Sequence, residues 1–190
     1  MLLTVSTTHV PARDLGHLLH KHPDRVQQFT QSFGSATVFY PEATEERCTA
    51  ALLLEVDPIR LARRRARTPD FSLAQYVNDR PYAASSLLGV VLADVFSTAR
   101  SGRCDARQEL ADSAIPLEIS LPVLPCRGGA DRARRVFEPL GWQVEADPIP
   151  LDERFPEWGD SRYVSLRLTG SVGSLFGVLA LESEPVDPRL

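Results

Sequence analysis

Alternating and continuous apolar segments along the chain predict the strands of a sheet. LLTVST, residues 2–7, is rich in β-branched side chains and predicts an opening strand. The segments 29–33 and 36–40, on either side of Gly34, predict a hairpin. The unbroken apolar run 50–54 is typical of a strand covered on both faces, so we expect it in the interior of the sheet.

The C-terminal half of the chain predicts three more strands. Residues 116–125, PLEISLPVLP, alternate in polarity, and their prolines favour a position at a sheet edge. Residues 143–146 and 162–172 predict two further strands. Between them, the acidic, proline-spaced segment 148–156 predicts a loop.

Helical segments are predicted between these strands. One follows Pro11, a basic one covers residues 58–67, and a third covers residues 128–141. The longest, about residues 82–100, is apolar almost all the way round, which is typical of a buried helix. Strands and helices mix without a βα repeat. The pattern therefore predicts a single α+β domain in which a mixed or antiparallel sheet packs against a long buried helix.

The composition is that of an ordinary soluble globular protein. The 190 residues, 43% of them hydrophobic and 24% charged, are enough to build one core. A net charge of −4 argues against a domain whose main task is to coat a nucleic-acid backbone. The cysteines, Cys48, Cys104 and Cys126, lack the spacing of a metal site or a disulfide framework. Because neither a signal peptide nor a membrane-spanning run is recognisable, we expect a cytoplasmic protein that contacts no membrane.

Three of the four histidines fall within DLGHLLHKHPDR, residues 14–25. His17 and His20 are three residues apart and could share a helix face, which leaves open a small metal-dependent enzyme that uses both and a carboxylate. HExxH, GxSxG and the Gly-rich nucleotide-binding motifs do not occur, which favours a structural or interfacial role for His17, His20 and His22. We therefore expect no catalytic residue, metal ligand or cofactor site in this chain.

Two segments have the composition of a binding surface. Residues 152–163, DERFPEWGDSRY, place aromatic side chains beside acids and arginines in a predicted loop, unless the aromatic rings fold back as a lid on the core. Residues 60–67, RLARRRAR, hold five arginines, which leaves open an RNA-binding helix beside the simpler interpretation of a solvated helix face. The residues that we expect at a partner interface are Phe155, Trp158, Arg162, Arg63 and Arg64.

Several long segments, in a fixed order, resemble one known family. They are TTHVPARDLGHLLHKHPDRVQ, VFYPEATEERCTAALLLEVDP, FSLAQYVNDRPYAASSLL, LPVLPCRGG and PLDERFPEWGDSRYVSLRLTG. Residues 1–172 resemble the N-terminal half of the bacterial Hen family of RNA 3′-terminal ribose 2′-O-methyltransferases, which act in RNA repair. Residues 173–190 depart from the family pattern, and we expect them to form an atypical C-terminal tail.

The resemblance implies a division of labour within the family. S-adenosylmethionine and a divalent metal belong to the methyltransferase half, which we expect to be absent from this chain. The N-terminal half is known as a module that docks on the bacterial polynucleotide kinase-phosphatase and activates its RNA ligase, so that it meets RNA indirectly through the complex. The resemblance therefore implies a non-catalytic activator in the cytoplasm, with no cofactor of its own.

Overall fold

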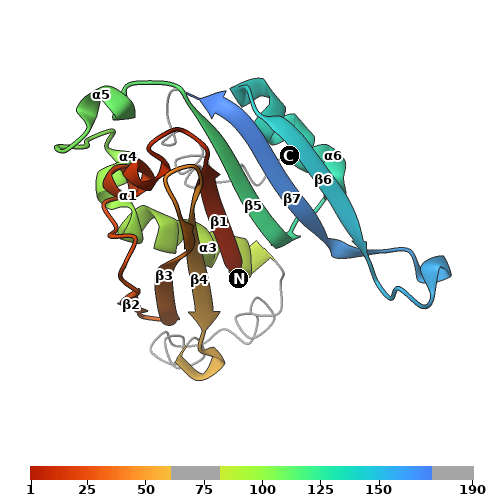
Figure 1. The fold of residues 1–190 in the computed structure, drawn as a ribbon. Helices are drawn as coiled ribbons and strands as arrows, with labels where there is room; N and C mark the ends of the chain where they lie inside the picture. The colour runs from red at the N-terminus through yellow and green to blue at the C-terminus, as the bar shows by residue number, and fades with distance from the viewer. Residues whose placement is uncertain (61–81, 173–190) are drawn as a thin grey trace.

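The computed structural model describes residues 1–60 and 82–172, which contain one seven-stranded antiparallel sheet (Figure 1). The strand order is β2-β3-β4-β1-β5-β7-β6. The predicted tail, residues 173–190, lies outside the described residues, as does most of the predicted basic helix. The strands are β1 (Leu2–Thr7), β2 (Gln27–Gln31), β3 (Gly34–Ala43), β4 (Cys48–Val56), β5 (Ile115–Pro125), β6 (Gln143–Pro150) and β7 (Asp160–Val172).

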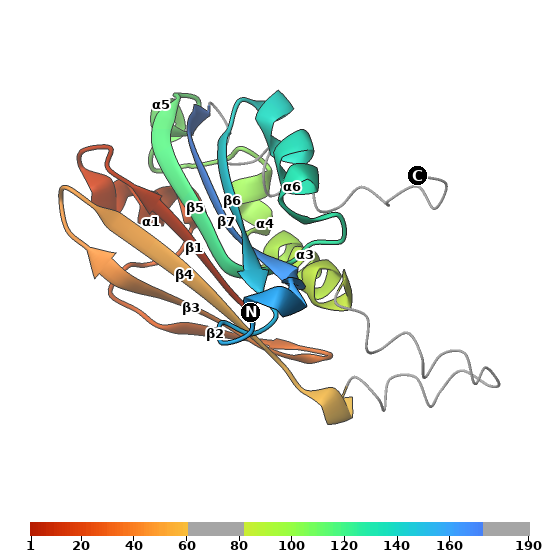
Figure 2. The ribbon, with the colours of Figure 1, turned by 90° about the vertical axis from the view of Figure 1, so that its right-hand side faces the viewer.

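The helices of the described residues include two that cover one face of the sheet. Figure 2 shows α3 and α6 on the same side, with the other face of the sheet left open. No helix in residues 1–60 or 82–172 is both long and apolar enough to cross a membrane. The helices are η1 (Ala12–Asp14), α1 (Leu15–Leu19), α3 (Tyr82–Val95), α4 (Ser97–Arg100), α5 (Gln108–Ala111), α6 (Gly129–Phe137), η3 (Glu138–Leu140) and η4 (Pro156–Trp158).

The core lies between the sheet and these helices. Buried and more exposed side chains alternate along β5, so this strand turns one face toward the helices. Successive side chains of a strand point to opposite faces, so every second residue is buried over residues 115–121 of β5 and 164–168 of β7. The intervening residues face solvent and are largely polar or proline. The buried residues of these two strands are Ile115, Leu117, Ile119, Leu121, Val164, Leu166 and Leu168.

The N-terminal strands follow the sequence prediction. Gln31 pairs with Gly34 across a two-residue turn, which confirms the hairpin of β2 and β3. β4 lies between β3 and β1, and Leu52 and Leu54 are buried in it, which confirms the predicted interior strand.

The predicted long helix is interrupted, and from Leu87 onward it is buried on one face only. α3 ends at Val95, Phe96 leaves the helical conformation with φ −109° and ψ 27°, and α4 then adds one turn. Val90 is 54% exposed although its neighbour Val91 is fully buried. The prediction of a helix buried all round is therefore wrong, because a helix lying on one sheet covers only the stripe that faces that sheet.

The predicted edge position of residues 116–125 is also wrong. They form β5, which lies between β1 and β7 in the interior of the sheet. The prolines are tolerated because β1 pairs only with residues 117–120, so Pro116, Pro122 and Pro125 all lie outside the segment of β5 that is paired with β1. Pro116 contributes its carbonyl oxygen, which accepts a hydrogen bond from Thr7 Oγ1 at 2.7 Å.

Two acidic groups, the buried Cys48 thiol and the partly buried Tyr40 hydroxyl beside the core, predict that the fold is sensitive to alkali. Burial raises the pKa of the Cys48 thiol from its ordinary 9.0 to about 11, although Arg13 opposes the shift. Burial likewise raises the pKa of the Tyr40 hydroxyl above its ordinary range, and a charge on Cys48 would raise it further. The folded chain therefore keeps protons that the unfolded chain loses, so these groups stabilise the fold below pH 9 and that contribution falls as the pH rises toward 11.

We expect the free energy of unfolding, measured with urea, to be steady near neutral pH and to decline between pH 9 and 11. Cys48→Ala creates a cavity and is less stable throughout, but it should lose less stability over this interval. An identical decline in the variant and in the parent chain would show that Cys48 does not contribute to it.

Candidate docking surface

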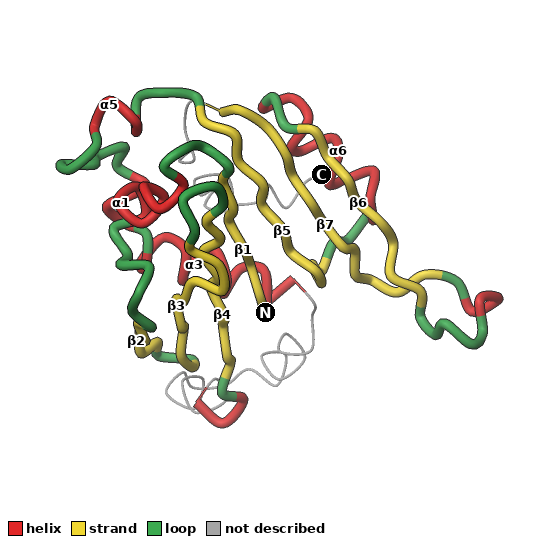
Figure 3. Tube along the Cα trace, in the orientation of Figure 1, coloured by secondary structure: helices red, strands yellow, loops and turns green. Residues whose placement is uncertain are grey.

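The hairpin of β6 and β7 extends away from the body of the molecule and ends in a loop, seen at the lower right of Figures 1 and 3. We call residues 151–159 the hairpin tip. The pairing of the two strands is irregular between Pro148 and Pro150, and Pro150 opposite Asp160 is the last pair. The predicted loop of residues 148–156 is therefore shifted, because β6 continues to Pro150.

Backbone hydrogen bonds give the hairpin tip a defined conformation. The Leu151 N–H donates to the Gly159 carbonyl at 2.9 Å and closes the loop. The Arg154 N–H donates to Asp152 Oδ1 at 2.8 Å, a turn that aspartate commonly stabilises. Gly159 has φ 76° and ψ −162°, a conformation open essentially to glycine alone. The sequence Asp-X-X-Phe-Pro-X-Trp-Gly thus builds its own turn.

The aromatic pair, Phe155 and Trp158, lies at this tip and is exposed. The two rings stack with centroids 4.6 Å apart and an interplanar angle of 13°. Phe155 is 42% and Trp158 57% exposed, so the interpretation that they fold back onto the core is wrong. The neighbouring Leu151 is 60% exposed and extends the apolar surface. Trp is, with Tyr and Arg, among the side chains most enriched at the energetic centre of a protein interface.

Arg162 lies at the base of the same hairpin and not at the tip. Its carbonyl oxygen accepts a hydrogen bond from the Cys126 N–H at 3.1 Å, and its side chain is exposed. Burial raises the pKa of the Cys126 thiol, although Arg132 opposes the shift. The fold therefore brings Phe155 and Trp158 together and places Arg162 a few residues away. The other two predicted interface residues, Arg63 and Arg64, lie outside the described residues.

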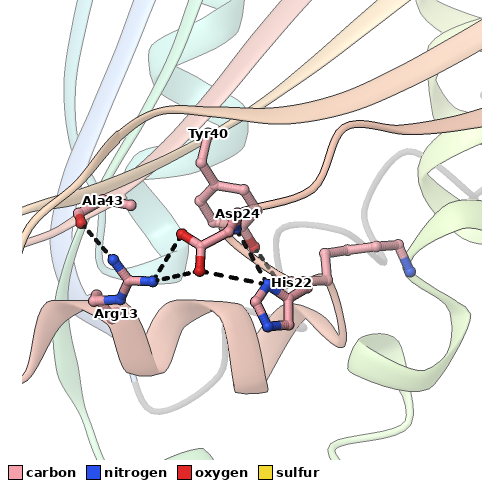
Figure 4. A network of polar contacts seen from close by, with 6 residues as sticks. Arg13, His22, Asp24, Tyr40 and Ala43 are labelled. Atoms are coloured by element: carbon pink, nitrogen blue, oxygen red, sulfur yellow. Dashed lines mark hydrogen bonds and ion pairs between the residues drawn. The ribbon is translucent and has the colours of Figure 1, made fainter.

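The histidine segment packs against the sheet through polar contacts (Figure 4). Arg13 Nη2 donates to both oxygens of Asp24, at 2.9 and 3.0 Å, and Arg13 Nη1 donates to the carbonyl of Ala43 at 3.0 Å. The Asp24 N–H donates to His22 Nδ1 at 3.2 Å. The Tyr40 hydroxyl donates to the carbonyl oxygen of Lys21 at 3.0 Å. These bonds join the loop after α1 to β3, which is a structural role.

All three histidines of the segment border an open hollow of about 450 Å³. His20 Nε2 lies 2.8 Å from the carbonyl oxygen of Arg103 and is engaged there, while His17 is exposed. No group of three or more His, Cys, Asp or Glu side chains in the described parts of the chain is placed to hold a metal ion. The arrangement does not favour the metal-dependent enzyme that the sequence left open.

Lys21, the single lysine of the chain, has its ammonium group near two aromatic rings. Its Nζ lies 5.3 Å from the centroid of Phe29 and 5.7 Å from that of Phe96. Burial lowers the pKa of Lys21, although Asp94 opposes the shift. Cation–π contact accounts for the position of this side chain and ties the histidine segment to β2 and to the end of α3.

The described residues thus combine a sheet with one open face and an exposed, stacked aromatic pair at the hairpin tip. The chain belongs to the family described as the RNA repair, ligase-Pnkp-associating, region of Hen1, whose model matches residues 1–179. Comparison with the curated proteins gives no match.

Solved structures have the same fold. One, titled "Structure of the Pnkp1/Rnl/Hen1 RNA repair complex", matches with a TM-score of 0.59 and 16% identity over 96% of this chain. Another, titled "Structure of Pnkp1/Rnl/Hen1 complex", matches with a TM-score of 0.56, also at 16% identity over 96% of this chain. In each case the chain spans 40% of the length of the chain that it matches.

Proposed function

We propose that this chain docks on a bacterial polynucleotide kinase-phosphatase and activates its RNA ligase, without catalysing a reaction of its own. The family to which the chain belongs supports the choice of partner. The observation that carries the docking is the exposed, stacked aromatic pair at the end of a projecting hairpin. These two side chains are exposed and so contribute little to the hydrophobic core. Exposure of two large aromatic rings to water is unfavourable, and burial against a partner would remove that cost.

Activation requires that the ligase have at least two conformations. The chain shifts the balance between them only as far as it binds one more tightly than the other. We propose that it binds the conformation competent for self-adenylylation, with Phe155 and Trp158 as the central contacts and Arg162 at the margin. Arg63 and Arg64 belong to the same proposal on the basis of sequence alone.

The proposal assigns no chemistry to the described residues. The histidines that could have held a metal are engaged with backbone groups or exposed singly, and we propose no site for S-adenosylmethionine or a divalent metal among them. RNA would reach this module through its partner.

The direct test measures self-adenylylation of the ligase, using the kinase-phosphatase from the same source with and without this chain. We expect co-elution of the two proteins and an increase of at least about tenfold in adenylylated ligase, within the usual range of allosteric coupling. Co-elution without increased adenylylation would contradict activation but retain docking. Separate elution with unchanged adenylylation would contradict both.

A further inference from the structure

The hairpin tip carries a concentration of negative charge around its aromatic pair. Asp152, Glu153 and Glu157 lie in the tip, and Asp160 adjoins it at the start of β7. Arg154 is the single basic residue among them. Four carboxylates and one guanidinium give the segment 151–160 a formal charge of −3, and its charged side chains are exposed apart from Asp152, which is partly buried.

These carboxylates are not neutralised within the described residues. Several carboxylates elsewhere have ion-pair partners: Arg13 pairs with Asp24, and Arg47 lies between Glu42 and Glu118. At the tip, by contrast, the described chain provides neither a hydrogen bond nor an ion pair to the side chains of Glu153, Glu157 and Asp160. Asp152 Oδ1 accepts the Arg154 N–H, and Asp152 has no ion-pair partner in the described chain. The negative charge of these exposed carboxylates is therefore available to a binding partner.

We propose that the partner surface which receives this tip is an apolar pocket with a rim of Lys and Arg side chains. The inference rests on the proposed docking function and specifies its chemistry. An aromatic pair is buried favourably in an apolar pocket, and the surrounding carboxylates are matched only by cations. Such a charge pattern steers the encounter and rejects partners with acidic surfaces. It also excludes RNA from the tip, because phosphates would meet uncompensated carboxylates.

The preformed loop strengthens this assignment. The tip is closed by the bond between Leu151 and Gly159, and the aromatic rings are already stacked. A preorganised tip loses little conformational entropy on docking, so the association rate is set mainly by diffusion and electrostatic steering. The association rate constant is therefore the quantity that reports the charge.

The test uses the variant Asp152→Asn/Glu153→Gln/Glu157→Gln. Asparagine at position 152 retains an oxygen that can accept the Arg154 N–H, so the loop conformation is preserved. The matched control is Glu45→Gln/Glu46→Gln/Glu109→Gln, which removes the same charge from exposed side chains without an ion-pair partner in the described chain. Association with the kinase-phosphatase is measured by surface plasmon resonance over a series of NaCl concentrations.

We expect the tip variant to associate about tenfold more slowly at low salt, with a weaker dependence on salt, and the control to behave like the parent chain. Binding that is unchanged in the tip variant but weakened by Trp158→Ala would overturn the charge inference and leave the proposed docking intact. The absence of binding by the parent chain at every salt concentration would overturn both. Retention of an RNA oligonucleotide by the parent chain, lost in Trp158→Ala, would show that the tip binds nucleic acid and would also overturn the inference.

Discussion

Gly34→Ala is expected to lower the free energy of unfolding by about 3 kcal/mol, because the new methyl group has no room. An alanine Cβ at this position would overlap the carbonyl oxygen of Glu55 and lie 3.0 Å from Val56 Cα on the neighbouring strand β4. Both are backbone atoms, so relief requires the two strands to separate. Without this clash, replacing a strand glycine by alanine would stabilise the protein by about 0.5–1 kcal/mol. A loss of stability in Gly34→Ala would therefore support the clash, and a gain would contradict it.

Gly141→Ala is the matched comparison. Gly141 has φ +88°, but an added Cβ would meet nothing within 4 Å. Its expected cost is about 1 kcal/mol, the strain of a left-handed residue alone. Urea unfolding of both variants measures the difference. An equal loss of stability in the two would refute the close approach of β3 and β4.

The example of Gly34 shows where the sequence is informative about this fold and where it is not. Its position between two apolar segments predicts the hairpin correctly, since a turn is specified by local conformational preferences. The reason that glycine is needed there is the approach of β4, a contact between residues far apart in the chain. The same limit explains β5, whose prolines favour an edge locally although β5 lies within the sheet and its prolines fall outside the segment paired with β1.

The candidate docking surface was predicted in composition but not in shape. The aromatic and acidic residues of segment 152–163 indicate a binding loop from the sequence alone. That the rings face solvent follows from the length of the β6–β7 hairpin, which carries them beyond the core. The excess of negative charge at the hairpin tip, where Arg154 is the single basic residue, becomes informative only once the structure shows exposed carboxylates around the aromatic rings. The spacing of the histidines left a metal site open, yet His20 lies against the carbonyl oxygen of Arg103 and His22 accepts the Asp24 N–H.

Trp158→Ala is expected to weaken binding of the kinase-phosphatase by about 30-fold or more, equivalent to roughly 2 kcal/mol, while the fold remains intact. The side chain is 57% exposed and contributes little to the core, so its loss should leave the thermal midpoint within about 1 °C of the parent value. Phe155 loses its stacking partner in this variant, which adds to the effect on binding because the tip is then less preorganised.

The control for this prediction is Val26→Ala, which removes a 73% exposed apolar side chain just before β2, at the opposite edge of the sheet. It should bind and activate the ligase like the parent chain. Trp158→Phe retains a ring that can stack on Phe155 and should recover most of the affinity. If Trp158→Ala and Val26→Ala bind equally well, the hairpin tip is not the docking site, and the family's association with the ligase must use another surface. If only Trp158→Ala loses affinity, activation should decline in proportion to occupancy, because docking and the conformational shift of the ligase are one linked equilibrium.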